Sequence, residues 1–320
     1  MPTLILKSSD VKSLLKMPDV LKAVENAFIE LGENKVNMPP KSYLVVEDGD
    51  FRAMPAAISS AAGMKWVNVH LKNKDKNLPS IMAILILNDP ETGYPLAIMD
   101  ATEITAYRTA AASAIASKYL ARKDSKSLGV IGAGHQAHTH IMAHLVLFEL
   151  TLIKVYDRSK AAVDRLIDSF SDYVLTECSI EETAASDIVC TLTPSRSPVI
   201  KHPWIKTGTH INAVGADAKG KQELESAILN KAVVIVDDVE QARAAGEINV
   251  PTSNGAFKPS QIHATLSDII IGKKKGRIDD IAITIFDSTG IAVEDIATAK
   301  LLYNKAIKQP KDTYTSLELV

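Results

Sequence analysis

A glycine-rich turn gives this sequence its most specific chemical signal. The motif G-A-G-H-Q-A spans residues 132–137, directly after the apolar run 128–131 and before a segment of helical period. In a strand, turn and helix of this kind, Gly132 allows the tight turn, Gly134 lets the backbone approach a pyrophosphate, and the small Ala137 lets helix and strand pack closely. The free amides at the start of the helix can hold the phosphate charge. The spacing therefore predicts a dinucleotide-binding site.

An acidic residue one strand further along strengthens that prediction. Asp157 follows the apolar run 152–156, where a carboxylate can accept hydrogen bonds from both ribose hydroxyls of the adenosine half of NAD. Arg158 leaves NADP open as a cofactor, because a guanidinium beside that ribose can pair with a 2′-phosphate. The alternative is an ordinary turn between strand and helix with an exposed aspartate.

Four histidines lie on the helix that follows the turn: His135, His138, His140 and His144. His140 and His144 have the spacing of two metal ligands on one helical face. However, no Glu follows His140 and no third ligand is indicated by the spacing. We therefore predict no metal site and expect these histidines at the surface.

Short apolar or β-branched runs alternate with segments of helical period through the centre of the chain. Helices are expected at 137–148 and 159–170, and strands at 128–131, 152–156, 188–192, 210–214, 233–236 and 281–286. Buried parallel strands that alternate with crossover helices predict a doubly wound α/β domain.

The first third of the chain has a different pattern. An amphipathic helix is predicted at 18–30, followed by β-like runs at 43–46, 64–69, 81–87 and 95–99. The polar, Pro- and Gly-containing segment 88–93 predicts a hairpin, so we expect an antiparallel sheet. An alanine-rich helix is predicted at 102–119 and a closing helix at 293–307. The last ten residues, from Lys311, show no core pattern and are expected to fray.

Charge and composition exclude several classes of protein. The 320 residues contain 36 Lys and Arg against 38 Asp and Glu, a net charge of −2, whereas nucleic-acid binders normally carry a basic surface. No apolar run reaches the roughly 18 residues needed to cross a membrane, and the N-terminus does not resemble a signal peptide. Cys178 and Cys190, the only cysteines, are expected to be buried and reduced. We therefore expect a cytoplasmic protein without nucleic-acid or membrane partners.

Several motifs resemble the ornithine cyclodeaminase/μ-crystallin family. They are the glycine turn, Met99-Asp100-Ala101-Thr102, and the stretches 107–112, 210–224 and 286–290. The resemblance runs from about residue 3 to residue 308 and is strongest to the archaeal alanine dehydrogenase branch. It implies a nucleotide-binding domain inserted in a discontinuous substrate and dimerisation domain. It also implies a homodimer in which two subunits join their N-terminal sheets into a barrel-like core.

The expected fold class is therefore α/β, with a Rossmann-type doubly wound parallel sheet inserted in a discontinuous α+β domain. The Rossmann domain is expected at 122–289. The substrate and dimerisation domain is expected to combine residues 1–121 with a C-terminal helix that returns to it within 290–320.

The resemblance also assigns roles to charged residues. Lys65 matches the family's substrate-site lysine, and Asp217 matches its catalytic acid/base at the carboxyl end of a strand. Lys41 corresponds to a carboxylate-binding residue that is often Arg, although a lysine loses bidentate geometry. Arg108 needs a partner for its charge on a mostly apolar helix, and a cofactor phosphate or substrate carboxylate would supply one. Without the resemblance, Lys65 would be taken for a surface lysine and Asp217 for a helix N-cap. Further dinucleotide contacts are expected from Ser80, Arg108, Thr109, Gln136, Ser159, Thr191, Thr193, Val214, Lys221 and Ser288.

The activity implied by the resemblance is NAD(P)-dependent oxidation at the Cα–N bond of a small amino acid, first of all L-alanine dehydrogenation to pyruvate and ammonia. Ornithine cyclodeamination to proline is an alternative. Arg52 disfavours it, because relatives of that type tend to place an acidic residue there and a cation would repel the δ-ammonium. The alternative is that Arg52 faces solvent. Pyrroline-2-carboxylate reduction and non-catalytic binding of NAD(P)H, as in the μ-crystallin branch, also stay open. The presence of both Lys65 and Asp217 favours an enzyme, because a binder needs no proton shuttle.

Overall fold

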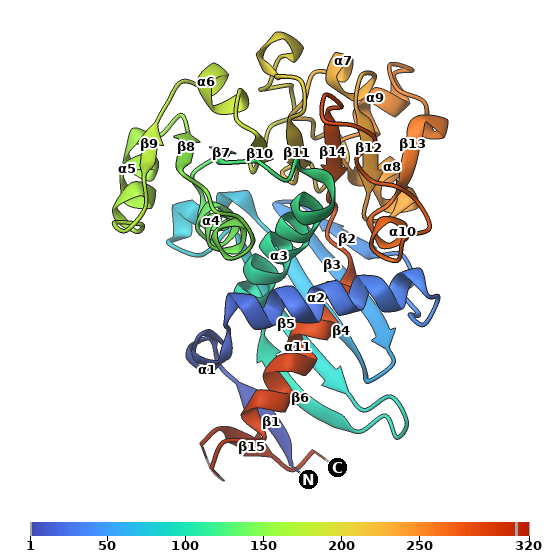
Figure 1. The fold of residues 1–320 in the computed structure, drawn as a ribbon. Helices are drawn as coiled ribbons and strands as arrows, with labels where there is room; N and C mark the ends of the chain where they lie inside the picture. The colour runs from blue at the N-terminus through green and yellow to red at the C-terminus, as the bar shows by residue number, and fades with distance from the viewer. Residues whose placement is uncertain (1, 311–312, 320) are drawn as a thin grey trace. The chain divides into compact units, whose positions relative to one another are not determined.

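The chain forms two compact units in the computed structural model, which describes residues 2–310 and 313–319, apart from the side chain of Lys74 (Figure 1). Unit 1 combines Met1–Thr109 with Ile291–Val320, and unit 2 is Ala110–Gly290. Helix α3 (Thr102–Leu120) contributes to both. The domain boundaries that we expected after residues 121 and 289 stay predictions.

Unit 1 is built on a seven-stranded sheet with the order β15-β1-β6-β5-β4-β3-β2. Strands β2 to β6 are antiparallel neighbours, as expected, whereas β1 joins β6 in parallel. The strands are β1 (Thr3–Leu6), β2 (Ser42–Val46), β3 (Gly49–Ile58), β4 (Ala61–Val69), β5 (Ile81–Asn88), β6 (Pro95–Asp100) and β15 (Thr315–Leu317).

Strand β15 corrects the expectation that the C-terminal segment frays. Its three exposed residues pair antiparallel with β1 through the backbone, which requires no apolar side chains. The part of that expectation that concerns residues 311, 312 and 320 lies outside the described residues. Strand β3 was also missed, because its Gly, Asp and Pro residues hide the alternation of a strand.

One face of this sheet is covered by helix α11 (Ala292–Ala306), which packs against β3, β4, β5 and β6, while α2 (Met17–Gly32) packs against α11 (Figure 1). Helix α2 buries Val20, Val24 and Phe28, a spacing of four that brings them onto one side. Two shorter helices complete the unit, α1 (Ser8–Leu14) and η1 (Leu71–Lys76). The covered face is therefore shielded from water.

The opposite face of the sheet is apolar and open. Leu44, Met82 and Ile84 are exposed there, and cross-strand pairing places them on the same face as Trp66 and Phe51. An exposed apolar surface of this kind is typical of a protein interface.

Unit 2 confirms the predicted doubly wound sheet. Its eight strands are all parallel, in the order β13-β12-β14-β11-β10-β7-β8-β9. The chain order therefore reverses between β7 and β10, and ligands bind at the carboxyl edge beside such a reversal. The strands are β7 (Ser127–Ile131), β8 (Leu152–Tyr156), β9 (Leu175–Glu177), β10 (Ile188–Thr191), β11 (His210–Ala213), β12 (Val233–Val236), β13 (Ile262–Thr265) and β14 (Thr284–Asp287).

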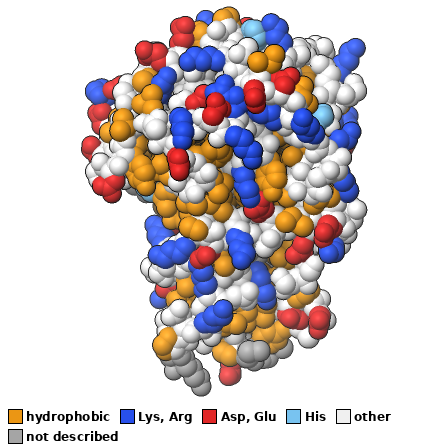
Figure 2. Space-filling view, viewed as in Figure 1, with side chains coloured by type: hydrophobic (Ala, Val, Ile, Leu, Met, Phe, Trp, Pro, Cys, Tyr) orange, Lys and Arg blue, Asp and Glu red, His pale blue; other side chains and the backbone are white. Residues whose placement is uncertain are grey.

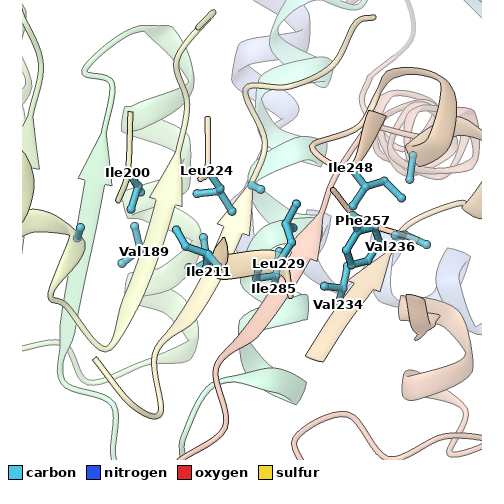
Figure 3. Close-up of a cluster of buried hydrophobic side chains, with 14 of the residues drawn as sticks. Val189, Ile200, Ile211, Leu224, Leu229, Val234, Val236, Ile248, Phe257 and Ile285 are labelled. Atoms are coloured by element: carbon cyan, nitrogen blue, oxygen red, sulfur yellow. The ribbon is translucent and has the colours of Figure 1, made fainter. Parts of the chain in front are cut away.

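The helices of unit 2 pack on a core of aliphatic side chains. Figure 3 shows one cluster, in which Val189, Ile211 and Ile285 from the central strands lie with Leu224 and Ile248 from the segments that follow β11 and β12. Since these strands are buried on both faces, they read as continuous apolar runs in the sequence. The helices are α4 (His135–Leu147), α5 (Lys160–Asp168), α6 (Ile180–Ala184), α7 (Ser226–Leu229), α8 (Val239–Ala245), α9 (Asn249–Ser253) and α10 (Leu266–Ile270).

Charges of both signs share the surface. On the face drawn in Figure 2, Lys and Arg side chains are interspersed with Asp and Glu side chains. Within the described residues, no helix is both long and apolar enough to span a bilayer. Both cysteines are free thiols, and Cys190 is buried as expected, whereas Cys178 is partly exposed.

Candidate active site

The glycine turn of unit 2 has the geometry that a dinucleotide phosphate requires. Gly132 has a φ of +105°, and a Cβ there would lie 3.0 Å from the backbone carbonyl of Leu192. Gly134 directly precedes α4, and a Cβ built on it would meet no atom within 4 Å. The amides at the start of a 13-residue helix are thus accessible beside an open position.

Asp157 lies at the neighbouring strand end and touches the same turn. Its Oδ2 accepts a hydrogen bond from the Ala133 amide and its Oδ1 one from the Ser159 amide, both at 2.8 Å. Each carboxylate oxygen has a second lone pair, so the half-buried side chain can still accept ribose hydroxyls. Arg158 and Ser159 are exposed beside it.

Two other predicted contact residues of unit 2 carry buried polar atoms that find no hydrogen-bond partner among the described residues. These atoms are Gln136 Oε1 and Ser288 Oγ. Buried polar atoms are normally paired, so orphaned ones at the carboxyl edge of a doubly wound sheet point to a polar ligand. Together with the open glycine turn, they fit a dinucleotide. Ala137 and Val214 are buried, as close packing around the turn requires.

The hydroxyl groups of Thr191 and Thr193 are hydrogen-bonded to another residue of the protein. Both donate hydrogen bonds of 2.6 Å to the carboxylate of Glu223, which is fully buried. Sequence reasoning missed Glu223, although an acidic residue beside the apolar Leu224 was a visible signal.

Asp217 lies in the loop after β11 and is not the cap of a helix. It forms an ion pair with Lys221, and both side chains are only partly exposed. The structure thus brings together two residues to which we assigned different roles, one catalytic and one in cofactor binding.

A buried cluster of charges in unit 1 contains two of the predicted substrate residues. Lys65, on the face of β4 covered by α11, is 1% exposed, and Arg108 on α3 is 5% exposed. Asp295 Oδ1 accepts hydrogen bonds from both cations, at 2.9 Å from Lys65 Nζ and 3.0 Å from Arg108 Nε. Glu294 accepts a further bond of 2.7 Å from Arg108. The partner that we expected Arg108 to find in a ligand is therefore supplied by α11.

Burial gives Lys65 an unusual acidity. Burial, together with the charge of Arg108, lowers the pKa of Lys65 to about 7, although Asp295 acts in the opposite direction. Lys41 also lowers this pKa, so its charge lies close enough to act on Lys65. A lysine with a pKa near neutrality can bind a carboxylate as a cation and can also exchange a proton.

Arg52 is buried on the same face of the sheet, which corrects the alternative that it faces solvent. Its Nε donates a 2.7 Å hydrogen bond to Asp50, and its guanidinium lies 5.5 Å from the centre of the Tyr43 ring. The charge of Arg52 is therefore compensated by Asp50.

The other two predicted contacts in unit 1 are Ser80 and Thr109. Ser80 Oγ is buried without a hydrogen-bond partner among the described residues, whereas the Thr109 hydroxyl donates to the Thr105 carbonyl at 2.6 Å. Ser80 can thus still accept a polar ligand.

Two histidines of α4 correct our placement at the surface. His135 and His138 are exposed, but His140 and His144 are fully buried. They form hydrogen bonds with Ser113 and Ser117 of α3, at 3.1 and 2.9 Å. Burial lowers the pKa of His144 to about 4, so it stays neutral. The described residues contain no group of three or more His, Cys, Asp or Glu that could hold a metal.

Asp295 and Glu294 are functional candidates that sequence reasoning missed. They are two adjacent acids in a helix whose neighbouring residues, from Ala292 to Ala299, are all buried. Buried charges need partners, so an acidic pair among the apolar residues of the first turns of this helix was the signal that could have revealed them.

Comparison with known proteins agrees with the resemblance. The model of the ornithine cyclodeaminase/mu-crystallin family matches residues 1–310. The alanine dehydrogenase of Archaeoglobus fulgidus is 49% identical over 311 residues, which cover 97% of each chain. A solved archaeal alanine dehydrogenase dimer with bound NAD superposes with a TM-score of 0.97, at 47% identity and full coverage of both chains. The Thermococcus litoralis Δ1-pyrroline-2-carboxylate reductase, solved with NADH and L-proline, gives a TM-score of 0.93 at 40% identity, over 96% of this chain and 98% of that one.

Proposed function

Because this chain belongs to the ornithine cyclodeaminase/mu-crystallin family, we propose that it is an NAD(P)-dependent L-alanine dehydrogenase that interconverts alanine with pyruvate and ammonia. The observation that carries the proposal is the buried pair of cations, Lys65 and Arg108, that share Asp295. The likeness to two alanine dehydrogenases supports alanine as the substrate.

The buried cations of unit 1 suit a carboxylate ligand. Lys65 and Arg108 are paired with Asp295 and Glu294, and Lys41 adds a positive charge close enough to act on Lys65. The oxygens of a substrate carboxylate would replace the water that burial removes from Lys65. In this role the two cations orient the amino acid so that its Cα hydrogen is presented for transfer.

The chemistry of oxidation and hydrolysis is divided between cofactor and protein. When bound, NAD supplies the hydride acceptor at its nicotinamide ring. Asp217 would take a proton from the water that adds to the iminium carbon and pass one to the departing ammonia. Lys221 would hold the Asp217 carboxylate in place through their ion pair.

NADH oxidation at 340 nm tests this proposal. The purified protein should consume NADH when given pyruvate and ammonia, and titration with NADH and NADPH should reveal a preference for NADH if Asp157 binds the ribose. Turnover of ornithine to proline without net NADH change would contradict the proposal. Binding of NADH without turnover of any of these substrates would indicate a binder, as in the μ-crystallin branch.

Reduction of Δ1-pyrroline-2-carboxylate is a second candidate. It is supported by the likeness to the Thermococcus litoralis reductase, whose bound L-proline is also a small monocarboxylate. The same assay separates the two, because this reductase would oxidise NADH with the cyclic imine and without ammonia. Ornithine is less strongly disfavoured than the sequence indicated, since Asp50 compensates Arg52.

We also propose that the protein is a cytoplasmic homodimer. The open apolar face of the unit 1 sheet and the dimer of the solved archaeal relative support the dimer. Light scattering should give about twice the 34.5 kDa of one chain. The two free thiols suit a reducing compartment.

The acidity of Lys65 predicts a specific pH dependence. Lys65 is protonated below its pKa of about 7, so binding of propionate, an unreactive analogue of the substrate, should weaken as the pH rises through 7. Replacing Asp295 by Asn removes the interaction that raises this pKa, so the break in a plot of inhibition constant against pH should move to lower pH.

Glu294→Gln is the matched control for that variant. Glu294 accepts its 2.7 Å hydrogen bond from Arg108, whereas Asp295 is bonded to Lys65 directly, so the break should move less in Glu294→Gln than in Asp295→Asn. A break that does not move in Asp295→Asn, or that moves equally in both variants, would refute the assignment of the break to Lys65.

A further inference from the structure

Glu223 joins the ends of two neighbouring strands of unit 2. One carboxylate oxygen accepts hydrogen bonds from the Thr193 amide at 2.7 Å and from the Thr193 hydroxyl at 2.6 Å. The other accepts from the Thr191 hydroxyl at 2.6 Å and from the Gly215 amide at 2.8 Å. Thr191 ends β10 and Gly215 follows β11, so a single side chain holds the two loops together.

Three further buried acids extend this arrangement along the edge of the sheet. Glu247 accepts hydrogen bonds from the Glu223 and Leu224 amides at 3.0 and 2.7 Å. Asp287, which ends β14, accepts from the Glu247 and Ile248 amides at 2.8 and 3.1 Å. Asp237, which follows β12, accepts from the Thr289 and Gly290 amides at 2.6 and 2.7 Å. We call these four residues the acid chain: Glu223, Glu247, Asp287 and Asp237.

Burying the four carboxylates of the acid chain costs free energy. This cost indicates that the positions of the backbone amides bound to them are important. All four side chains are 0 or 1% exposed. Burial raises the pKa of Glu223, of Glu247 and of Asp287, the last to about 8. Apolar side chains could fill this space without that penalty, but they could not fix backbone amides at defined positions.

Two glycines are adapted to these carboxylates. A Cβ on Gly215 would lie 2.6 Å from the Glu223 carboxylate and 2.1 Å from the Thr193 carbonyl oxygen. A Cβ on Gly246 would lie 2.6 Å from the Asp287 carboxylate. Any residue larger than glycine at either position would displace the neighbouring carboxylate. The conformation of each loop therefore depends on having both the glycine and the buried acid.

The position of Glu223 relates it to one half of a dinucleotide. In a doubly wound sheet, the ligand lies along the carboxyl edge across the point where strand order reverses, here between β7 and β10. The glycine turn after β7 and Asp157 after β8 account for the pyrophosphate and the adenosine half. The nicotinamide half must then extend over β10 and β11, the two strands that Glu223 joins.

We propose that Glu223 is a positioning residue that fixes the loops after β10 and β11 beneath the nicotinamide half of the bound dinucleotide. This inference rests on the proposed function insofar as that function requires NAD. It gives Thr191 a new role, since its fully buried hydroxyl serves Glu223.

Comparison of two ligands tests the proposal, with calorimetry as the readout. NADH and ADP-ribose share the adenosine and pyrophosphate, but ADP-ribose lacks the nicotinamide. In Glu223→Gln the new amide group would point at backbone or hydroxyl donors, so the two loops lose an acceptor. We expect the Kd for NADH to rise about tenfold, whereas the Kd for ADP-ribose should change less than about twofold.

Two further variants keep the test decisive. Glu225→Gln is the matched control, because this partly buried acid two residues away accepts from the His202 amide at 2.8 Å and from neither loop; both affinities should stay at wild-type values. Thr191→Val removes one donor and preserves the carboxylate, so it should weaken NADH several-fold with little effect on ADP-ribose. If Glu223→Gln does not fold, the proposal is judged from Thr191→Val, by the ratio of its change in Kd for NADH to its change in Kd for ADP-ribose.

The outcomes separate this proposal from the function on which it rests. If Glu223→Gln loses the same affinity for NADH and for ADP-ribose, Glu223 contributes to general stability and the proposal is overturned. Unchanged affinities for both ligands would overturn it as well. Failure of the wild-type protein to bind either ligand would contradict the proposed function and remove the basis of the inference. A selective loss of NADH affinity supports it even if alanine is not the substrate.

Discussion

Replacing Lys65 by methionine is expected to lower kcat/KM for L-alanine by about 10³-fold, because a buried donor to the substrate carboxylate is lost. Methionine has a similar length and flexibility but carries no charge and no donor. Asp295 would keep its hydrogen bond from Arg108, a cation that it shares with Glu294. Initial rates at 340 nm give kcat and KM, and calorimetry should show an NADH affinity within about twofold of wild type.

Lys72→Met is a suitable control for the same change of residue. Lys72 is an exposed lysine of η1 that pairs with Asp48 at 2.6 Å, and surface ion pairs contribute little. Its kinetic constants should equal those of the wild type. A Lys65→Met enzyme that retains more than a tenth of wild-type kcat/KM would refute the role of Lys65.

The features that were predicted well from the sequence are those whose residues lie close together in the chain. The glycine turn, the apolar run before it and Asp157 lie within 30 residues of one another, so strand, turn and helix could be assigned from spacing alone. The same is true of α2, whose period of apolar residues is visible along a single helix. Local patterns of this kind also set the order of elements that defines the doubly wound sheet.

The charged partners could not be predicted in this way, because they are distant in the chain. Lys65 and Asp295 are 230 positions apart, and no periodicity relates a strand near one end of the chain to a helix near the other. Arg108 illustrates the consequence: its need for a partner was foreseen, but the partner was sought in a ligand and lies in α11. His140 and His144 show the same limit, since Ser113 and Ser117 precede them by 27 positions.

The acid chain was missed for a related reason. Each of its members looks like an ordinary loop acid, and only the fold shows that its carboxylate receives amides from another loop. Thr191 and Thr193 were singled out as dinucleotide contacts, but their hydroxyl groups donate to Glu223. Residues that position a site thus leave weaker sequence signals than residues of the motif itself.

Asp217→Asn is expected to lower kcat by 10²- to 10⁴-fold, roughly the range contributed by a positioned acid/base group. The amide has the same shape and can still accept a hydrogen bond from Lys221, so the loop after β11 should keep its conformation. It cannot take a proton from water or give one to ammonia. We therefore expect the KM for alanine and the Kd for NADH to change less than about threefold, since only the step that moves the proton is impaired.

The exposed Asp164 provides the comparison that isolates this effect. It also forms an ion pair with a lysine four positions away, Lys160, but lies on α5 and has no part in the proposed chemistry. Asp164→Asn should therefore retain wild-type kcat, which would show that loss of such a pair is not in itself responsible. Near-normal turnover in Asp217→Asn would exclude Asp217 as the proton carrier. A large rise in the Kd for NADH would instead assign Asp217 and Lys221 jointly to cofactor binding, because the ion pair links the two residues.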